Sequence, residues 1–276
     1  MKNLFYRLLI YLDTASESDT NYNIALYMAH NFQKISTMGI SQLSTACFVS
    51  PATISRFCRT LGYDNYAHLK QDCYVLSSYR NRLDNLINMP LKLIQEEPQK
   101  AVTKYAENIC ENISQLSSLL DWKVIDEVLK LIYEQDEIIM FGTQFSHSAA
   151  LHLQTDLLML EKFTVAHMDI DRQIECAKSL SSQSVVILIT LNGNLFNSSN
   201  KLIQYLKKSE AKVILITSNE NLVLPIDVIH TIYVGTSNMA KYAKQALLMT
   251  MELMSLRYYA TYYATVKQKT YDDFMT

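Results

Sequence analysis

The spacing of apolar and polar positions changes along the chain, and it predicts two kinds of domain. Up to about residue 82, apolar residues recur every three or four positions, which is the period of amphipathic helices. From residue 137 onward, short continuous apolar runs alternate with helix-like segments. Continuous apolar runs indicate strands covered on both faces, as in a parallel sheet between helices. We therefore predict a helical domain followed by an α/β/α domain.

The helical domain is expected to span residues 1–82 and to form a compact five-helix unit. Periodic apolar residues and flanking breakers place its helices at about 3–12, 22–32, 40–46, 51–61 and 66–82. Residues 83–105, which include Pro90 and Pro98, are interpreted as a linker. Because this stretch is not rich in glycine, we expect it to be partly helical rather than a flexible tether.

The second domain is expected at residues 106–265, followed by a tail at 266–276. Five apolar runs predict the strands of one parallel sheet, at 137–142, 163–168, 184–190, 212–218 and 230–235. Helical segments at 146–160, 170–180 and 195–208 would cover both faces of this sheet. The predicted fold class is therefore an all-helical domain plus a three-layer α/β/α domain with a five-stranded parallel sheet.

The segment around Ser50 carries clear helix start and stop signals. Ser50 is a suitable N-cap, Pro51 fits the first helical position, and Gly62 fits the left-handed position that ends a helix. One side of this helix is apolar, and the opposite side carries Ala52, Arg56 and Arg59. A short helix at 40–46 and a turn at 47–49 precede it. This arrangement is typical of a helix-turn-helix whose second helix lies in the major groove of DNA.

The alternative is a group of helices that only pack together, because two arginines on a surface helix are common. If the helix does read DNA, arginine can bind guanine through two hydrogen bonds, while serine and threonine bind base edges or phosphates. Residues 1–80 hold seven Lys and Arg against five acids, and the rest of the chain holds 18 against 22. The candidate DNA-binding residues are Ser50, Ala52, Thr53, Ser55, Arg56 and Arg59, with Tyr63 and Lys70 as further phosphate contacts.

Four runs in this segment resemble the N-terminal domain of RpiR-type bacterial transcription regulators. They are ISQL (40–43), VSPATISRF (49–57), LGY (61–63) and NYAHLK (65–70). Ser44 and Phe48 depart from the family pattern, which usually has a small residue and a turn glycine at these places. A phenylalanine at a position that needs a positive φ would be strained, so the turn is the unusual part of the motif.

Polar loops follow three of the predicted strands, at 142–148, 190–194 and 217–221. Ligands of parallel sheets bind at the carboxyl ends of the strands, beside helix N-termini. The loops lack the glycine patterns of dinucleotide and nucleoside triphosphate sites, and their hydroxyls and amides suit a phosphate monoester. The candidate ligand-binding residues are Ser146, Ser148, Thr190, Asn192, Gly193, Asn194 and Thr217.

The second domain resembles the sugar isomerase (SIS) domain, which binds phosphosugars and is the partner domain of RpiR-type regulators. The resemblance covers about 125–235 and rests on FG-x-x-x-S (141–146), ITLNGN (189–194) and VILITSN (213–219). Gln144 and Phe145 replace small residues of the family pattern, Asn192 replaces a serine, and Leu195 replaces a threonine. Such a pocket would bind an altered ligand, bind weakly, or serve only for assembly.

The last helical segment, at about 238–265, bears on assembly. Leu247, Met251, Met254 and Tyr258 form an apolar stripe, which Leu248 and Tyr262 widen. The stripe could pack on the domain's own sheet, but its width and its Met and Tyr content favour a subunit interface. We therefore expect a homodimer or homotetramer formed through the SIS-like domain and this helix.

Cysteine usage and apolar runs indicate a cytoplasmic protein that does not contact membranes. The five cysteines contain no C-x-x-C pair, which favours buried thiols in a reducing compartment over a metal site. His147 and His152 are spaced five apart and do not share a helical face, so we expect no metal. The N-terminal apolar run is too short for a secretory signal, and no run reaches the roughly 18 residues of a membrane span.

Three functions remain open from the sequence. The first is a DNA-binding regulator of carbohydrate metabolism whose SIS-like domain senses a phosphosugar and mediates oligomerisation. The second is a regulator whose altered SIS-like domain only dimerises. The third, an aldose–ketose isomerase, is disfavoured because no general base is placed with a nucleophile. We expect no enzyme, no catalytic residue and no cofactor, and as partners a double-stranded DNA operator and a phosphosugar effector.

Overall fold

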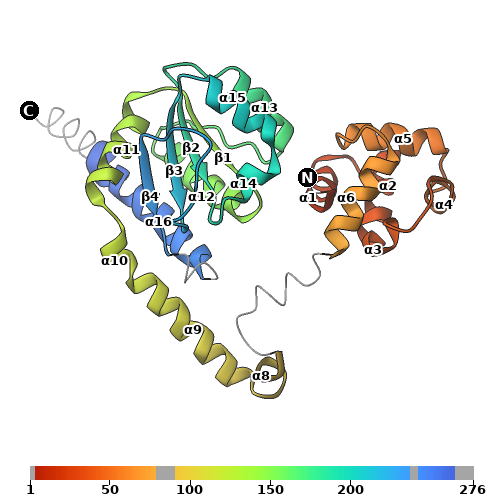
Figure 1. The fold of residues 1–276 in the computed structure, drawn as a ribbon, viewed down its shortest axis with the longest axis horizontal. Coiled ribbons are helices and arrows are strands. Elements are labelled where there is room, and N and C mark those ends of the chain that lie inside the picture. Colours follow the sequence, from red (N-terminus) through yellow and green to blue (C-terminus); the bar gives the residue numbers. More distant parts are fainter. Residues whose placement is uncertain (1–3, 79–90, 237–241, 265–276) are drawn as a thin grey trace, which may run out of the picture. The chain divides into compact units, whose positions relative to one another are not determined.

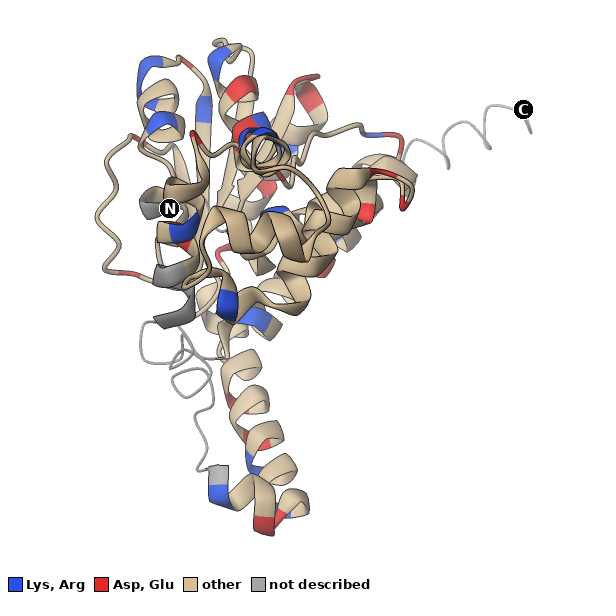
Figure 2. Cartoon of the chain, turned by 90° about the vertical axis from the view of Figure 1, so that its right-hand side faces the viewer, with Lys and Arg blue, Asp and Glu red and all other residues tan. Residues whose placement is uncertain are grey.

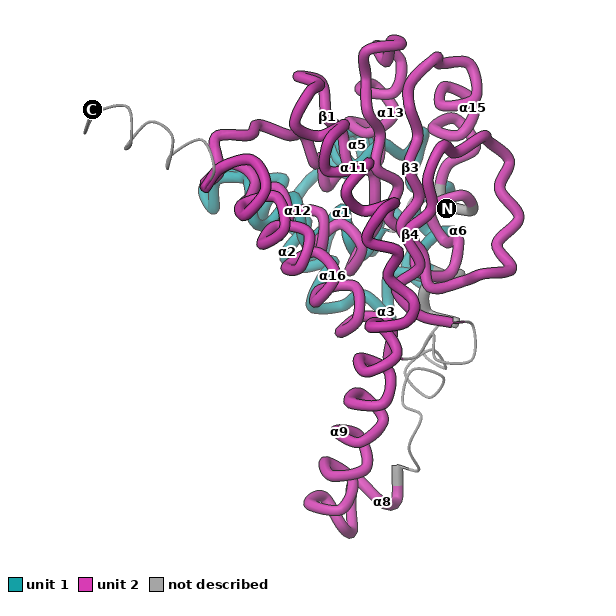
Figure 3. The backbone as a smooth tube through the Cα atoms, turned by 90° about the vertical axis from the view of Figure 1, so that its left-hand side faces the viewer, with its two compact units in different colours: residues 1–88 teal, residues 89–276 magenta. Residues whose placement is uncertain are grey.

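The computed structural model describes residues 4–78, 91–236 and 242–264, and Figure 1 shows its elements. The chain forms two compact units, Met1–Asn88 and Met89–Thr276, which are coloured separately in Figure 3. Part of the predicted linker, 83–90, and the predicted tail, 266–276, lie outside the described residues. None of the helices in the described ranges is long and apolar enough to span a membrane.

Unit 1 is helical, as predicted, and has one apolar core. Its helices are α1 (Leu4–Thr14), α2 (Thr20–His30), α3 (Phe32–Ile35), α4 (Ile40–Ala46), α5 (Pro51–Thr60) and α6 (Tyr66–Ser78). The expected second helix is divided, because the chain leaves helical geometry at Asn31 before α3 begins. The core is built from one face of each of the longer helices, including Leu8, Met28, Leu43, Ile54, Phe57 and Leu69.

Unit 2 begins with helices and continues as an α/β domain. The first helices are α8 (Leu91–Glu96), α9 (Pro98–Ser114), α10 (Leu116–Leu119) and α11 (Trp122–Glu134). The strands are β1 (Ile138–Gly142), β2 (Val185–Ile189), β3 (Lys212–Thr217) and β4 (His230–Tyr233). They are parallel and lie in the order β1-β2-β3-β4.

Helices cover both faces of this sheet (Figure 1). The remaining elements are α12 (Phe145–Met159), α13 (Ile170–Lys178), α14 (Asn194–Ser198), α15 (Asn200–Lys208), α16 (Ala243–Tyr258) and a π-helix (Tyr259–Tyr263). Successive strand residues point to opposite faces, so Ile187 joins the core under α11, α12 and α16, whereas Leu188 joins the core under α13 and α15. The three-layer prediction is confirmed.

The prediction of five strands is wrong, because 163–168 does not form a strand. Val165 makes a single bridge with Ile139, through hydrogen bonds of 2.7 and 2.8 Å to the backbone of β1. Side chains bond two other carbonyl groups of this segment: Gln154 donates to the oxygen of Thr164, and Gln173 donates to that of His167. In a longer ladder the carbonyl of His167 would face β1, so the bond from Gln173 competes with continued pairing.

The structure also corrects the interpretation of the C-terminal stripe. Leu247, Met251, Met254 and Tyr258 are buried in the core between α16 and the sheet of their own unit. The alternative weighed from the sequence, packing on the domain's own sheet, is therefore right for these four residues. Tyr262 stacks on Tyr133 of α11, with ring centroids 4.4 Å apart.

The thiols of the described chain are all free. Cys58 and Cys73 are buried in unit 1, and burial raises the pKa of each thiol to about 11. Both are therefore protonated and behave as small apolar core residues. Cys110 is exposed, so the expectation of buried thiols does not hold for every cysteine.

Candidate functional site

The predicted recognition helix is α5, and its ends are fixed by the residues that the sequence indicated. The hydroxyl of Ser50 accepts from the backbone N–H of Thr53 at 3.1 Å, and Pro51 occupies the first turn. Gly62 has φ +79° just beyond the helix. Ile54, Phe57 and Cys58 are buried, so the opposite side of α5 faces solvent. Local capping and one apolar face therefore position this helix.

The solvent side of α5 presents most of the predicted DNA-binding side chains. Ala52, Arg56 and Arg59 are exposed, and Thr53 and Ser55 are partly exposed beside them. Arg56 donates from Nη2 to Oγ1 of Thr53 at 3.2 Å, and this hydroxyl lies 3.0 Å from that of Ser50. The three side chains form one hydrogen-bonded row at the start of the helix, which limits the rotamers of Arg56.

Tyr63 is not a phosphate contact in this structure. Its side chain is 1% exposed, and its hydroxyl donates to Oδ2 of Asp72 at 2.5 Å. Burial and the nearby carboxylate raise the pKa of this phenol, so it stays protonated. Asp72 also accepts from the backbone N–H of Leu4, and Arg7 donates to the carbonyl of Leu61 at the end of α5. These buried polar groups join α1, α5 and α6.

Lys70 lies at the edge of unit 1, on α6, where Nζ donates to the carbonyl of Thr37 at 3.4 Å. The structure thus gives it a partner outside α5. The chain from Thr20 to Tyr63 contains no Asp or Glu. This stretch includes α2, α3, α4 and α5, and Figure 2 shows the described chain with Lys and Arg in blue and Asp and Glu in red. A surface with cations and no carboxylates is suited to a polyanion.

The candidate ligand site lies at the carboxyl ends of the strands in unit 2. Gly142 of β1 pairs with Ile189 of β2, which pairs with Ile216 of β3. The loops that follow these strands therefore meet at one edge of the sheet, as predicted from the parallel topology. The site residues supplied by the first loop are Ser146, which is 8% exposed in the first turn of α12, and Ser148, which is exposed.

Several of the predicted ligand hydroxyls are used inside the protein. Thr217 and Ser218 both donate to the carbonyl of Leu191, at 3.1 and 3.0 Å, and Thr190 accepts weakly from the N–H of Leu195. These bonds hold the second loop against the third. Thr190 and Thr217 are buried, so in this conformation they support the loops rather than face a ligand.

The second loop is also filled by apolar side chains. Gly193 has φ +78°, and a Cβ there would lie 2.6 Å from Cδ1 of Leu222. Leu195, which stands where the resemblance predicts a threonine, is fully buried in the core. Of the predicted ligand residues in this loop, Asn192 and Asn194 are the ones with exposed side chains.

Comparisons with known proteins agree with the two units. The model of the helix-turn-helix domain, rpiR family, matches residues 8–74, and the model of the SIS domain matches residues 131–264. Residues 8–74 therefore form a helix-turn-helix domain of the rpiR family, and residues 131–264 form an SIS domain. An uncharacterized HTH-type transcriptional regulator of Providencia stuartii is 24% identical over 71% of this chain and 68% of that protein.

Two further proteins are similar to most of this chain. The HTH-type transcriptional regulator HexR of Pseudomonas aeruginosa is 25% identical over 70% of this chain and 66% of its own length. The chain thus spans about two thirds of the relatives it matches. The structure of Vibrio vulnificus NanR complexed with ManNAc-6P covers 99% of this chain and 98% of that one, with a TM-score of 0.51. At 17% identity, NanR shows that the fold is shared.

Two residues near the strand ends of unit 2 were not selected from the sequence as site residues. Gln173 is buried and donates from Nε2 to the carbonyls of Gly142 and His167, which fixes the end of β1. His147 is buried, with Nε2 3.2 Å from the carbonyl of Ala166. Burial lowers the pKa of this imidazole, so the ring is neutral. No sequence pattern distinguishes either residue from a surface position.

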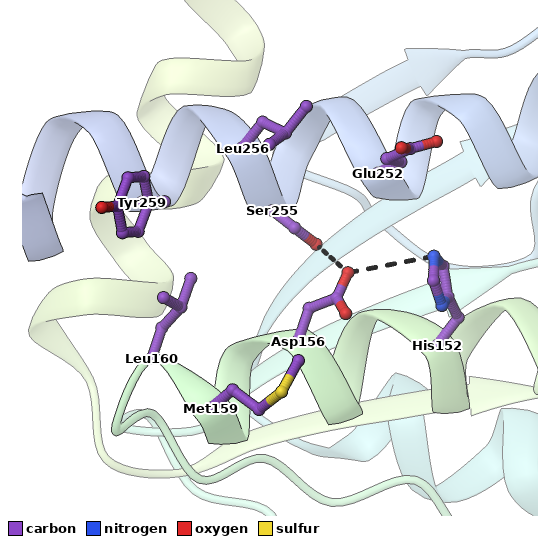
Figure 4. A pocket seen from close by; sticks show the side chains of 8 residues that line it. All are labelled: His152, Asp156, Met159, Leu160, Glu252, Ser255, Leu256 and Tyr259. Atoms are coloured by element: carbon purple, nitrogen blue, oxygen red, sulfur yellow. Dashed lines mark hydrogen bonds and ion pairs between the residues drawn. The ribbon is translucent and has the colours of Figure 1, made fainter.

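A shallow hollow of about 430 Å³ lies away from the strand ends, between α12 and α16 (Figure 4). Asp156 occupies its middle, where it accepts from Ser255 at 2.8 Å and lies 3.9 Å from Nε2 of His152. The surrounding residues are largely apolar: Met159, Leu160, Leu256 and Tyr259. The sequence pattern did not indicate this hollow, because its residues come from two distant helices. Within the described residues, no group of His, Cys, Asp and Glu is arranged to hold a metal ion.

Proposed function

We propose that this chain is a sequence-specific DNA-binding transcriptional regulator whose unit 1 reads DNA through α5. The observation that carries the proposal is the solvent side of α5, where Arg56 and Arg59 stand in a stretch without carboxylates. Ser50, Ala52, Thr53 and Ser55 are the shorter side chains at the same end of the helix. Arginine at such positions supplies both base and phosphate contacts.

The test begins with the selection of a binding site from a random double-stranded DNA library by the full chain. Replacing Arg56 or Arg59 with Ala is then expected to weaken binding to that site by about 5- to 150-fold, as loss of a base contact does, without lowering the melting temperature. Lys34→Ala is the matched control, because it removes an exposed cation outside α5. Parent-like binding by both arginine variants at the same salt concentration would show that α5 is not the reader.

We further propose that unit 2 senses a phosphosugar at the carboxyl edge of β1, β2 and β3 and regulates carbohydrate metabolism. The convergence of three polar loops at one edge supports this role, and so does the SIS fold. The chain is proposed to bind its ligand without converting it. Assay of aldose–ketose interconversion tests that point directly, and measurable turnover would contradict it.

The same loops also favour a second candidate function for unit 2. Thr190, Thr217 and Ser218 are engaged within the protein, and Leu195 and Leu222 fill the space beside them. On these grounds, unit 2 would serve only in assembly. The two candidates make opposite predictions about binding of sugar phosphates.

A thermal-shift screen with hexose, pentose and amino-sugar phosphates, including the ManNAc-6P present with NanR, separates these candidates. A ligand at 100 times its Kd stabilises the folded state by about 2.7 kcal/mol, which gives a clear shift. Asn192→Leu should abolish the response, whereas Ser182→Ala, at the amino end of β2, should retain it. Silence across the panel would favour the assembly role.

A further inference from the structure

Phe48 is an exposed aromatic residue next to α5, and it is not one of the DNA-binding residues proposed above. It lies in the turn between α4 and α5, its side chain is 97% exposed, and its φ is +54°. A bulky residue in the left-handed region is strained by its Cβ. The turn therefore combines an unfavourable backbone conformation with a large apolar side chain in solvent.

The hydrogen bonds of the turn explain why this ring points outward. The N–H of Val49 donates to Ser44 at 2.9 Å, and the N–H of Phe48 donates to Thr45 at 3.1 Å. This is the Schellman pattern, in which the left-handed residue is usually glycine and the next residue packs inward. Val49 does contact the core, so the geometry directs Phe48 away from it.

The end of α5 provides a comparison within the same unit. The N–H of Tyr63 donates to Cys58 at 2.8 Å, and the N–H of Gly62 donates to Arg59 at 2.8 Å. Glycine occupies the left-handed position there, at φ +79°, without strain. At the equivalent position after α4, the backbone of Phe48 is strained. Its side chain is not buried in unit 1, so no apolar burial within the unit offsets this strain. A contact outside the unit would supply that burial.

The surroundings of Phe48 indicate which partner it fits. No Asp or Glu occurs between Thr20 and Tyr63, and Phe48 precedes the N-cap Ser50 by two positions. Thr45, Ser50 and Ala52 are exposed near it in the chain. The start of α5 also carries the positive end of the helix dipole. A surface with hydroxyls, no carboxylates in this stretch and one aromatic ring is complementary to DNA, where the 5-methyl group of thymine is the apolar feature of the major groove.

We propose that Phe48 is a specificity-determining residue that packs on a thymine 5-methyl group beside the bases read from α5. This inference rests on the proposed DNA-binding function and adds a preference at one base pair. The preference would come from apolar contact, so it would be insensitive to salt, unlike the contacts of Arg56 and Arg59.

The first experiment compares the DNA sites selected by the parent and by Phe48→Gly from the same random library. The parent is expected to prefer thymine at one position, and the variant should lose that preference while retaining the others. Phe48→Gly should keep or raise the melting temperature, because it removes backbone strain and no buried surface. Phe5→Ala is the matched control, since Phe5 is an aromatic residue of α1 that is 50% exposed.

The second experiment replaces that thymine with deoxyuridine, which removes the methyl group alone. Burial of one such carbon group is worth about 0.8 kcal/mol, so the parent should lose about fourfold in affinity. Phe48→Gly should bind both DNAs equally. Equal losses in parent and variant would overturn the proposal, as would an unchanged site preference.

The outcomes also separate this inference from the function on which it rests. If the parent selects no DNA site, both are wrong. If Arg56→Ala weakens binding but Phe48→Gly binds with the parent's preference, only the role of Phe48 is wrong. If Phe48→Gly changed the molecular mass of the protein in solution but not its base preference, Phe48 would be assigned to a contact between protein chains instead.

Discussion

At the scale of single residues, Tyr63 shows how strongly the role of a side chain depends on its neighbours. It follows Gly62 at the end of α5, where a phenol could reach a DNA phosphate. Instead, its ring lies in the core of unit 1, and its hydroxyl donates to Asp72 of α6. Arg7 lies with its guanidinium carbon 6.0 Å from the centre of the same ring. These contacts connect the end of α5 to α1 and α6.

Tyr63→Phe is expected to lower the free energy of unfolding of unit 1 by about 1–3 kcal/mol, because the buried carboxylate of Asp72 loses a donor. DNA affinity of the folded protein should stay at the parent value, since the hydroxyl is not at the surface. Denaturant unfolding and a DNA-binding titration below the transition measure the two effects. Loss of affinity without loss of stability would return Tyr63 to the DNA contacts.

His147 makes the stability of unit 2 dependent on pH. Its folded-state pKa lies below the unfolded value of about 6.5 because the ring is buried. Between these two values the unfolded chain binds more protons, so the free energy of unfolding falls as pH falls below about 6.5. Above that pH the imidazole is neutral in both states, and its contribution is constant.

His147→Gln should therefore reduce the loss of stability between pH 7.5 and pH 5.5, whatever its effect at neutral pH. The pKa of His167 is also lowered by burial, and that residue is present in both proteins. Denaturant unfolding at a series of pH values gives the comparison. Identical slopes for parent and His147→Gln would contradict the assignment.

At the scale of elements, three helices end in the same way, with a left-handed residue followed by a residue whose N–H donates back into the last turn. Glu161 follows α12 with φ +63°, and the N–H of Lys162 donates to Leu157 at 2.8 Å. This is the same pattern that follows α4 at Phe48 and α5 at Gly62. In two of these three ends, a residue with a Cβ occupies the position that favours glycine.

Glu161→Gly should raise the free energy of unfolding of unit 2 by up to about 1 kcal/mol. Relief of left-handed strain, about 1–2 kcal/mol, is partly cancelled by the greater freedom of glycine in the unfolded chain. Thermal unfolding measures the gain, and DNA binding should not change. Gly62→Ala provides the opposite comparison, because it adds a Cβ at φ +79° and should destabilise unit 1. A lower stability for Glu161→Gly would mean that the contacts of the Glu161 side chain stabilise the fold by more than the backbone strain destabilises it.

At the scale of the whole molecule, one face of α16 is left open by the sheet. The buried stripe of this helix faces its own core, whereas Leu256 of α16, Tyr259 of the π-helix and Met159 of α12 are exposed around one hollow. These residues lie around the hollow of Figure 4. Paired DNA-binding units fit operators with two half-sites, so we propose that a second copy of the chain covers this face.

Leu256→Glu should shift the molecular mass in solution toward that of a monomer, because it puts a carboxylate in the proposed interface. Val223→Glu is the control, as Val223 is a highly exposed apolar residue in the loop before β4. Size-exclusion chromatography with light scattering measures the mass. An oligomer that survives Leu256→Glu and Met159→Glu would place the interface elsewhere. A monomeric parent would exclude assembly altogether.

Much of the architecture was predictable because its determinants are local. Ser50, Pro51 and Gly62 define α5 through caps that involve only neighbouring residues, and continuous apolar runs locate the strands that lie within the sheet. The segment 163–168 has the same composition as a strand, yet Gln154 and Gln173 take its carbonyls. Such competition between side chains distant in sequence leaves no local pattern, so the fifth strand was predicted wrongly.

The sequence by itself determined where α5 begins and ends, which side of α5 is apolar, and that the loops after three parallel strands meet at one edge. These features follow from chain periodicity and short-range hydrogen bonds. Only the tertiary structure decided that the stripe of α16 is core, that Tyr63 donates to Asp72, and that Thr190 and Thr217 support loops instead of facing a ligand. In each case the partner of the side chain is a group distant in sequence. Tertiary packing determines which group that is, and the periodicity of the chain does not.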